Sequence, residues 1–238
     1  MVEPEDFFVL SDPLASELFA GCDFVWEILP KLKGLVESLT GGESTLKGEI
    51  GPGAYISDRD NFISEGAVIH PGAYVLGPAF IGPGAEVRHG AFVRENVIML
   101  EGSVLGHASE AKNSLIMAQA KAPHFNYLGD SILGTGVNLG AGTKLSNLTI
   151  LSRKDPETGK RPTVKIDIDG KVYDTKLAKI GAILGDGVQT GCNSVLNPGC
   201  LVGPNTLIYA NVTLKKGFTK PFRIIKLRQE IEEVARRM

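Results

Sequence analysis

Aliphatic residues recur at every sixth position through the middle of the chain. Gly or Pro repeatedly fills the positions between them, as in IGPGAE and IHPGAY. A hexapeptide period of this kind is typical of a β-solenoid, in which each hexapeptide supplies one short strand and one turn. The aliphatic series runs through Ile63, Ile69, Val75, Ile81, Val87, Val93, Met99 and Leu105, restarts at Leu133, Leu139 and Leu145, and ends with Leu184, Thr190, Leu196, Val202 and Ile208.

Small residues follow four places after the first of these aliphatics, as at Ala67, Ala73 and Ala79. Three hexapeptides make one triangular coil, so we expect the large side chains to fill a prism and the small ones to fit near its corners. Neighbouring coils would then pair as parallel strands roughly 4.8 Å apart. The predicted fold class is therefore an all-β parallel solenoid with helical segments at its two ends.

The two ends of the chain show helical spacing instead. DPLASELF and DFVWEILPKLKGLVESL predict two N-terminal helices with Asp12 and Asp23 as N-caps, the second kinked or split by Pro30. Trp26 is expected to pack against its neighbours, with a ligand pocket as the alternative. Apolar residues in TKPFRIIKLRQEIEEVARRM predict a C-terminal helix. The predicted domains are an N-terminal helical segment (1–44), a solenoid (45–215) and the C-terminal helix (216–238).

Two irregularities interrupt the period of six. Met117 and Leu133 are sixteen residues apart, so QAKAPHFNYLGDS is predicted to leave the coil as a loop that carries His124. A loop on a rigid scaffold is a frequent place for chemistry, and His exchanges protons near neutral pH without special tuning. The charged insertion at about 151–178, RKDPETGKRPTVKIDIDGKVYDTK at its centre, is predicted as a β-hairpin with DGK as a turn.

Residues eighteen apart stack on adjacent coils, because a triangular coil contains eighteen residues. Arg94 and Lys112 have this spacing and each follows an inward position, so both should point outward on one face. An Arg fork beside a Lys point charge suits a phosphate, although two solvated surface charges are the alternative. His89 and His107 stack in the same way and predict a surface ladder, since no carboxylate or Cys completes a metal site around them.

Composition narrows the functional classes. A net charge of -2 gives no reason to propose a nucleic-acid or membrane-surface partner. Cys22, Cys192 and Cys200 are odd in number and form no CxxC pair, so neither a disulfide framework nor a zinc site is expected. The N-terminus lacks the basic start of a signal peptide, and nowhere do 18 apolar residues follow one another. We therefore expect a cytoplasmic protein.

Several motifs resemble a known enzyme family. Arg94, EAKNS (110–114), HFNYLGD (124–130), VNLGAG (137–142) and Asn147 stand at matching spacings without a gap. They resemble the acetyltransferase half of the bacterial bifunctional enzyme that acetylates glucosamine-1-phosphate and then attaches UMP from UTP. The solenoid more generally resembles the hexapeptide-repeat transferases. This resemblance implies a left-handed parallel β-helix, a homotrimer, acetyl-CoA as co-substrate and no metal at the acyl-transfer site.

The resemblance also implies a role for individual residues. His124 would be the base that deprotonates the substrate ammonium. The implied function is an acetyl-CoA-dependent N-acetyltransferase that acts on a small amino-sugar phosphate such as glucosamine-1-phosphate, or on a related amino sugar. The remaining implied contacts are Arg94 and Lys112 to the sugar phosphate, Tyr127, Asn138 and Asn147 to the sugar, and Ala141, Cys192 and Ala210 along an acetyl-CoA groove between subunits.

Three departures from the family keep other functions open. Only some 45 residues precede the solenoid, so the pyrophosphorylase domain with its Gly-rich loop is absent from this chain. Leu148 stands where a Tyr usually follows the Asn, and the hairpin at 153–176 replaces a shorter connection that bears a Lys. One alternative is a non-catalytic or regulatory solenoid subunit associated with a sugar-phosphate nucleotidyltransferase. Another is an acyltransferase that uses longer acyl chains or nucleotide-linked sugars.

Overall fold

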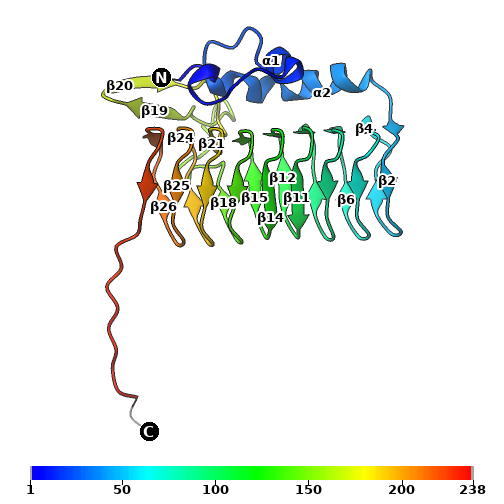
Figure 1. Cartoon of the computed structure of the whole chain (residues 1–238). Coiled ribbons are helices and arrows are strands. Elements are labelled where there is room, and N and C mark those ends of the chain that lie inside the picture. The colour runs from blue at the N-terminus through cyan, green and yellow to red at the C-terminus, as the bar shows by residue number, and fades with distance from the viewer. Residues whose placement is uncertain (1, 237–238) are drawn as a thin grey trace.

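The computed structural model describes residues 2–236, and its centre is a parallel β-solenoid (Figure 1). The chain passes through three parallel sheets in turn, so each sheet forms one face of a three-sided coil. Face 1 comprises β1 (Thr45–Leu46), β4 (Asn61–Ile63), β7 (Ala79–Ile81), β10 (Val97–Met99), β13 (Ser114–Ile116), β16 (Ile132–Leu133), β21 (Ala182–Leu184), β24 (Cys200–Val202) and β27 (Gly217–Thr219). Face 2 comprises β2 (Glu49–Ile50), β5 (Val68–Ile69), β8 (Glu86–Val87), β11 (Val104–His107), β14 (Lys121–His124), β17 (Asn138–Leu139), β22 (Gln189–Thr190), β25 (Leu207–Ile208) and β28 (Ile224–Ile225). Face 3 comprises β3 (Tyr55–Ile56), β6 (Tyr74–Val75), β9 (Phe92–Val93), β12 (Glu110–Lys112), β15 (Tyr127–Gly129), β18 (Lys144–Leu145), β23 (Val195–Leu196) and β26 (Thr213–Leu214).

The residues predicted to point inward fill the prism. Every aliphatic member of the three runs is buried there, which confirms the interior and the parallel solenoid. Thr190 takes one of these positions as a polar residue, and its hydroxyl shares a 2.8 Å hydrogen bond with that of Thr143. A buried hydroxyl is tolerated when it is paired in this way. The left-handed winding implied by the resemblance stays a prediction.

Residues 119–131 form part of the coil, and the prediction of a loop there is wrong. They contribute strands β14 and β15, each paired with strands of the coils on either side. The inward positions are Ile116, Ala122 and Leu128, which keep the spacing of six. Met117, from which the spacing was counted, instead packs outward among the residues that contact the N-terminal segment.

The coil loses one residue at the same corner, between faces 3 and 1, on two successive coils. Consecutive inward residues are five apart between Ala111 and Ile116, and again between Leu128 and Leu133. Strand partners on these coils are therefore seventeen residues apart instead of eighteen, as for residues 110 and 127. The irregular spacing reflects a tighter corner, so the residues around His124 belong to the rigid wall of the solenoid.

The close packing of β11 on β14 offers a test of the pairing between these two strands. A Cβ added at Gly106 would lie 1.9 Å from the backbone oxygen of Pro123. Because neither backbone can move without breaking its ladder, Gly106→Ala is expected to lower the free energy of unfolding by about 1–3 kcal/mol, measured by urea denaturation.

Gly34→Ala is the matched control for that substitution. Gly34 lies in helix α2 (Leu32–Thr40), where an added Cβ meets nothing within 4 Å. Ala in a helix interior should raise stability by roughly 0.5–1 kcal/mol. An unchanged urea midpoint in Gly106→Ala would contradict the packing of β11 on β14.

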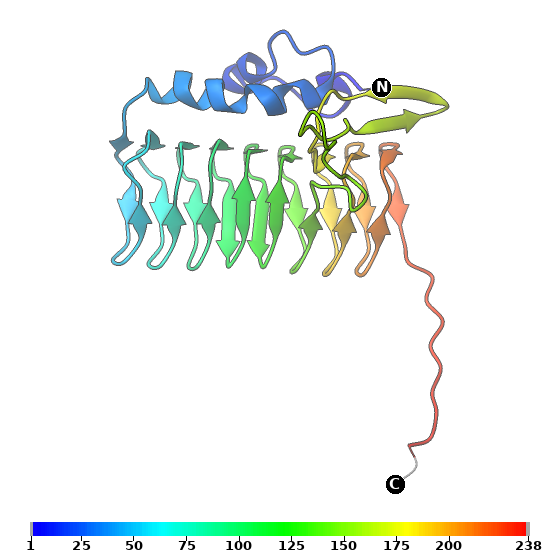
Figure 2. The same ribbon diagram turned by 180° about the vertical axis from the view of Figure 1, so that it is seen from behind.

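The N-terminal segment covers face 1 of the solenoid (Figures 1 and 2). Asp12 is the predicted N-cap, since its carboxylate accepts the Ala15 N–H at 2.8 Å. The prediction for Asp23 is wrong, because the Glu27 carboxylate instead accepts the N–H groups of residues 23 and 24. Pro30 lies where the helix splits. The elements are the 3-10 helices η1 (Pro4–Asp6) and η2 (Val25–Lys31) and the α-helices α1 (Pro13–Leu18) and α2 (Leu32–Thr40).

The predicted hairpin is confirmed as β19 (Lys165–Ile168) paired antiparallel with β20 (Lys171–Asp174). It lies beside the N-terminal segment, where Tyr173 meets Trp26 edge to face with ring centroids 6.1 Å apart. Trp26 is buried and stacks on Phe24 at 5.0 Å, which confirms its packing role. The hairpin and helices thus form a second hydrophobic core over face 1, and within residues 2–236 they leave faces 2 and 3 uncovered (Figures 1 and 2).

The C-terminal helix predicted at 216–238 is wrong for the residues described. Strands β27 and β28 extend faces 1 and 2, because residues 224 and 225 pair with 207 and 208. Residues 226–236 then leave the solenoid without regular structure (Figure 1), and residues 237–238 lie outside the described part. Leu227, Ile231 and Val234 are 49%, 85% and 74% exposed, and a helix this short gains little in water without a surface to pack on.

Candidate active site

The corner between faces 2 and 3 holds four predicted site residues in one column. The carbonyl oxygens of His124, Ala141 and Cys192 each accept a backbone N–H from the next coil, at 2.9, 2.8 and 2.9 Å. Those donors belong to residues 142, 193 and 211, so Ala210 occupies the same column one coil further on. The structure therefore brings the predicted base together with the three residues predicted for the acetyl-CoA groove.

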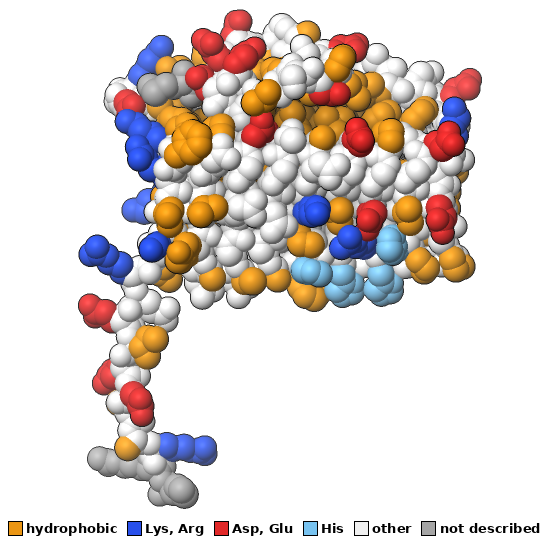
Figure 3. Space-filling view, viewed as in Figure 1, with side chains coloured by type: hydrophobic (Ala, Val, Ile, Leu, Met, Phe, Trp, Pro, Cys, Tyr) orange, Lys and Arg blue, Asp and Glu red, His pale blue; other side chains and the backbone are white. Residues whose placement is uncertain are grey.

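Side chains in this column become smaller after His124. On its N-terminal side His89 and His107 stack, with ring centroids 5.5 Å apart and planes within 5°, which confirms the predicted ladder. Histidine side chains gather along this edge, on the side away from the N-terminal helices (Figure 3). On the C-terminal side the column continues with Ala141, Cys192 and Ala210. Within residues 2–236, no three His, Cys, Asp or Glu residues are grouped so as to hold a metal ion.

His124 is held by a rigid backbone while its side chain is exposed. Its N–H donates to the side chain of Asn126 at 3.0 Å. Asn126 is buried and donates in turn to the Gly140 carbonyl at 2.9 Å. The imidazole itself makes no hydrogen bond or ion pair with the residues described, so both ring nitrogens are open to a ligand.

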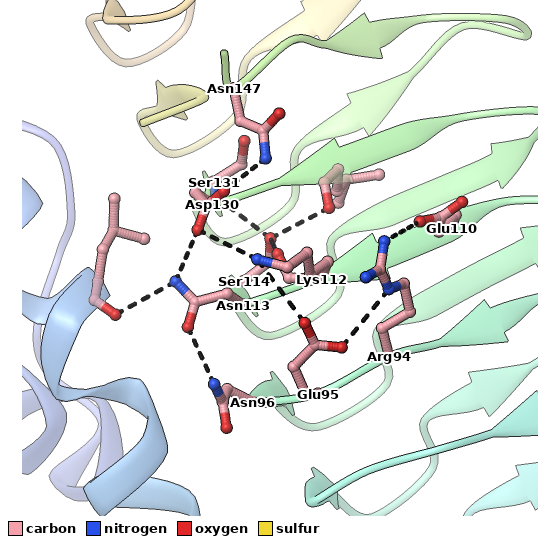
Figure 4. A network of polar contacts seen from close by, with 12 residues as sticks. Arg94, Glu95, Asn96, Glu110, Lys112, Asn113, Ser114, Asp130, Ser131 and Asn147 are labelled. Atoms are coloured by element: carbon pink, nitrogen blue, oxygen red, sulfur yellow. Dashed lines mark hydrogen bonds and ion pairs between the residues drawn. The ribbon is translucent and has the colours of Figure 1, made fainter. Parts of the chain in front are cut away.

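Arg94 and Lys112 lie on adjacent coils at the edge of face 3, as the spacing predicts. The Arg94 N–H donates to the Ala111 carbonyl at 2.8 Å, which places the two residues in register. Carboxylates that the sequence analysis did not single out surround both cations (Figure 4). Arg94 Nη1 lies 3.0 Å from Glu110 Oε1, and the hydrogen bond to Glu110 raises the pKa of Arg94.

One of these carboxylates bridges the pair. Glu95 Oε2 lies 3.5 Å from Arg94 Nε, and Glu95 Oε1 lies 3.7 Å from Lys112 Nζ. Lys112 Nζ is also 3.8 Å from Asp130 Oδ1. Two cations thus face three carboxylates, and the pair is internally neutralised in the single chain. Glu110 and Asp130 stand within the motifs that identified the site, so their spacing could have indicated this.

A ladder of Asn and Asp side chains runs along the tightened corner between faces 3 and 1 (Figure 4). Asn96, Asn113 and Asp130 have φ angles of 58°, 46° and 46°, a left-handed region that Asn and Asp tolerate better than most residues. Asn96 donates to Asn113 at 3.4 Å and Asn113 to Asp130 at 3.0 Å. Asn147 donates to the other Asp130 oxygen. Asn147, predicted to hold the sugar, therefore also belongs to a structural ladder.

Tyr127 lies beside Asn147 at the centre of face 3. A Cβ added at Gly129 would meet Asn147 Nδ2 at 2.5 Å and Tyr127 Oη at 2.7 Å, so both polar groups sit over this glycine. Burial, followed by the charges of Glu110 and Asp130, raises the pKa of Tyr127. Its hydroxyl therefore stays protonated near neutral pH and can donate a hydrogen bond.

Asn138 is separated from the other predicted sugar contacts. It lies in β17 on face 2, where it pairs with Lys121 and Gln189. Arg94, Lys112, Tyr127 and Asn147 instead belong to face 3 or its edge. A single chain therefore presents the predicted site as two half-buried groups on either side of the His124 corner.

A cavity of about 570 Å³ lies elsewhere, between the N-terminal segment and face 1. Val9, Leu14, Phe80, Leu100 and Met117 contribute to its apolar walls, and none of the predicted site residues lines it. Asp186 at its edge accepts the N–H groups of residues 9 and 135 at 2.8 and 2.7 Å. The bond to residue 9 ties the N-terminal segment to the solenoid at the edge of this cavity.

Two family models match the chain. Residues 75–166 match the "GMPPB C-terminal domain", and residues 181–216 match "Bacterial transferase hexapeptide (six repeats)". The first match contains Arg94, Lys112, His124, Tyr127 and Asn147. The second contains Cys192 and Ala210.

Curated relatives match about half of the chain. It is 40% identical over 118 residues to the "Bifunctional protein GlmU" of Methanococcus vannielii, covering 49% of this chain and 26% of that protein. It is 33% identical over 117 residues to the "Bifunctional sugar-1-phosphate nucleotidylyltransferase/acetyltransferase" of Sulfurisphaera tokodaii, covering 48% of this chain and 27% of that protein. The chain thus spans about a quarter of the length of these relatives.

Among the solved structures found to be similar to this chain is the acetyltransferase domain of PglB from Neisseria gonorrhoeae FA1090. It is 12% identical, with a TM-score of 0.29, covering 70% of this chain and 48% of that chain. The same domain in complex with acetyl coenzyme A is 16% identical, with a TM-score of 0.25, covering 72% and 54% respectively. Within the described residues no helix is both long and apolar enough to cross a membrane.

Proposed function

We propose that this chain, which carries hexapeptide repeats of the bacterial transferase type, is an acetyl-CoA-dependent N-acetyltransferase that acts on an amino-sugar phosphate. The observation that carries the proposal is the exposed, unpaired His124 imidazole on a rigid corner. It stands where the column of side chains changes from rings to Ala141, Cys192 and Ala210. A base beside a surface with little side-chain bulk suits an amine acceptor and a long thioester donor.

The chemistry requires two protons to leave the amino-sugar nitrogen, the first of them before the attack. An amino sugar arrives as an ammonium, which has no lone pair to attack a carbonyl. His124 accepts the first proton, and the free amine then forms the C–N bond with the acetyl carbonyl. The C–S bond to coenzyme A breaks, and the departing thiolate takes the second proton from the nitrogen, which leaves the neutral amide. General base catalysis of this kind contributes typically about 10²–10⁴-fold in rate.

The remaining roles follow from position. Arg94 and Lys112 would hold the sugar phosphate, with Tyr127 donating to a sugar hydroxyl. Binding at these residues would keep the amine close to the thioester and reduce the entropic barrier. Acetyl-CoA would lie along Ala141, Cys192 and Ala210, and Asn147 and Asn138 would complete the sugar contacts.

Asn138 leads to a prediction about assembly, because it lies on a different face from the other sugar contacts. Faces 2 and 3 are uncovered and expose Leu207 and Ile224 on one and Tyr55 and Tyr74 on the other. A second copy packed there would bring its own face 2 to the site. We expect a homotrimer of left-handed coils, with a mass by light scattering three times the 25.4 kDa of the chain. A monomer that retains full activity would contradict both the trimer and the shared site.

The activity itself is tested by a screen of amino sugars and their phosphates with acetyl-CoA, with release of free thiol as the readout. Exposed Cys192 contributes its own thiol, so reactions without acceptor give the background. The proposed function requires thiol release that depends on the acceptor, with N-acetylated product identified by mass spectrometry.

A regulatory solenoid subunit is the second candidate. It is favoured by the carboxylates that neutralise Arg94 and Lys112, since a phosphate must compete with them. It predicts no thiol release with any acceptor and formation of a stable complex with a sugar-phosphate nucleotidyltransferase. The same screen therefore separates the two functions.

A further inference from the structure

Arg94, Lys112 and the three carboxylates beside them, Glu95, Glu110 and Asp130, form a charged network. Glu95 differs from the other two carboxylates in how its side chain is held. Asp130 accepts hydrogen bonds from Asn113 and Asn147, and its side chain is 9% exposed. Glu110 accepts a 3.0 Å hydrogen bond from Arg94. Among the described residues, the Glu95 side chain has only its two ion pairs, at 3.5 and 3.7 Å, and it is 29% exposed. It is therefore the one carboxylate of the three that can leave without breaking a hydrogen bond.

The backbone of Glu95 is nevertheless fixed in place. Its carbonyl accepts the Asn113 N–H at 2.8 Å, which continues the ladder of the tightened corner. The side chain starts from a rigid point and spans both cations, one oxygen toward each (Figure 4). Two oxygens of a phosphate held by Arg94 and Lys112 would take these same positions.

We propose that Glu95 is a built-in competing anion that sets a charge threshold for the acceptor. This inference rests on the proposed function, because it takes Arg94 and Lys112 as the phosphate contacts. A ligand with a single negative charge gains nothing over the carboxylate that it displaces. A phosphate monoester carries close to two charges above its second pKa near 6, so it gains one. Glu95 thereby favours monoesters over carboxylates and phosphodiesters.

The selectivity has a measurable size. Partly exposed ion pairs are each worth about 0.2–1 kcal/mol, so displacing the two of Glu95 should weaken ligand binding by roughly 2- to 30-fold. Glu95→Gln keeps the shape and removes the charge. Its affinity for glucosamine-1-phosphate, measured by calorimetry at pH 8, should rise by about that factor.

Charge selection separates this role from a general electrostatic effect. The methyl phosphodiester of the same sugar carries one charge at every pH of the experiment, and Glu95→Gln should bind it more tightly than the unchanged protein does. Between pH 8 and pH 5 the phosphate monoester loses a charge, so its affinity should fall less in Glu95→Gln. Glu65→Gln, at an exposed position outside the network, makes the same charge change and should leave all three quantities unaltered.

Each outcome decides a different point. If the unchanged protein binds the monoester and Glu95→Gln binds it no more tightly, the competing-anion role is overturned while the phosphate contacts stand. Equal gains in Glu95→Gln and Glu65→Gln would overturn it as well, in favour of long-range electrostatics. If neither protein binds the monoester, both the phosphate contacts and this role fail. Acyl transfer to an unphosphorylated amine would still support the proposed acetyltransferase.

Discussion

Replacement of His124 by Ala is expected to lower kcat by about 10²–10⁴-fold near neutral pH, the usual contribution of a general base. Folding should be retained, because the imidazole is exposed and makes no contact within the described residues that the fold depends on. The backbone at this corner is held by Asn126, which the substitution leaves in place. Steady-state kinetics with the best acceptor from the screen would measure kcat and KM separately.

His107→Ala is the matched control for that loss. His107 lies in the same column, one coil away, and its Nδ1 is 3.0 Å from the His89 carbonyl oxygen. Its removal should leave kcat near that of the unchanged protein. An unchanged rate in His124→Ala would exclude His124 as the base, and equal losses in both variants would point to damage along the column.

Removal of Arg94 or Lys112 should have the second largest effect. Each substitution to Ala is expected to weaken binding of the phosphorylated sugar by about 1.5–3 kcal/mol, the range for hydrogen bonds to charged groups. Affinity for the unphosphorylated sugar and for acetyl-CoA should hardly change. Because both cations contact one anion, the double variant should cost less than the sum of the two single variants. Calorimetry of the unchanged protein, the two single variants and the double variant, each with the sugar and with its phosphate, measures these affinities.

Arg88→Ala tests whether such a loss is specific. Arg88 pairs with Glu86 at 2.7 Å near β8, outside the network, so its removal breaks a comparable ion pair. It should leave the affinity for the phosphorylated sugar unaltered. Equal losses for the phosphorylated and free sugars in the Arg94 and Lys112 variants would instead mean that these cations are solvated surface charges.

The sequence alone determined the parallel solenoid and its hairpin insertion. The period of six identifies which residues point inward. These residues are buried because any other register of the coil would place polar side chains inside the prism. The hairpin could be predicted from the alternation in TVKIDI and the DGK turn, and it forms at β19 and β20. The eighteen-residue spacing also placed Arg94 beside Lys112, since one regular coil separates them.

Only the tertiary structure decided which side chains contact one another at the candidate site. One-residue losses at two corners change partners from eighteen to seventeen apart, and that shift aligns Asn96, Asn113, Asp130 and Asn147 in a ladder. A periodic pattern reports local burial, whereas contacts between coils depend on the length of every corner. The position of Glu95 between two cations and the separation of Asn138 follow from that geometry. The C-terminal strands do too, because pairing with β25 stabilises residues 224–225 more than an isolated helix could.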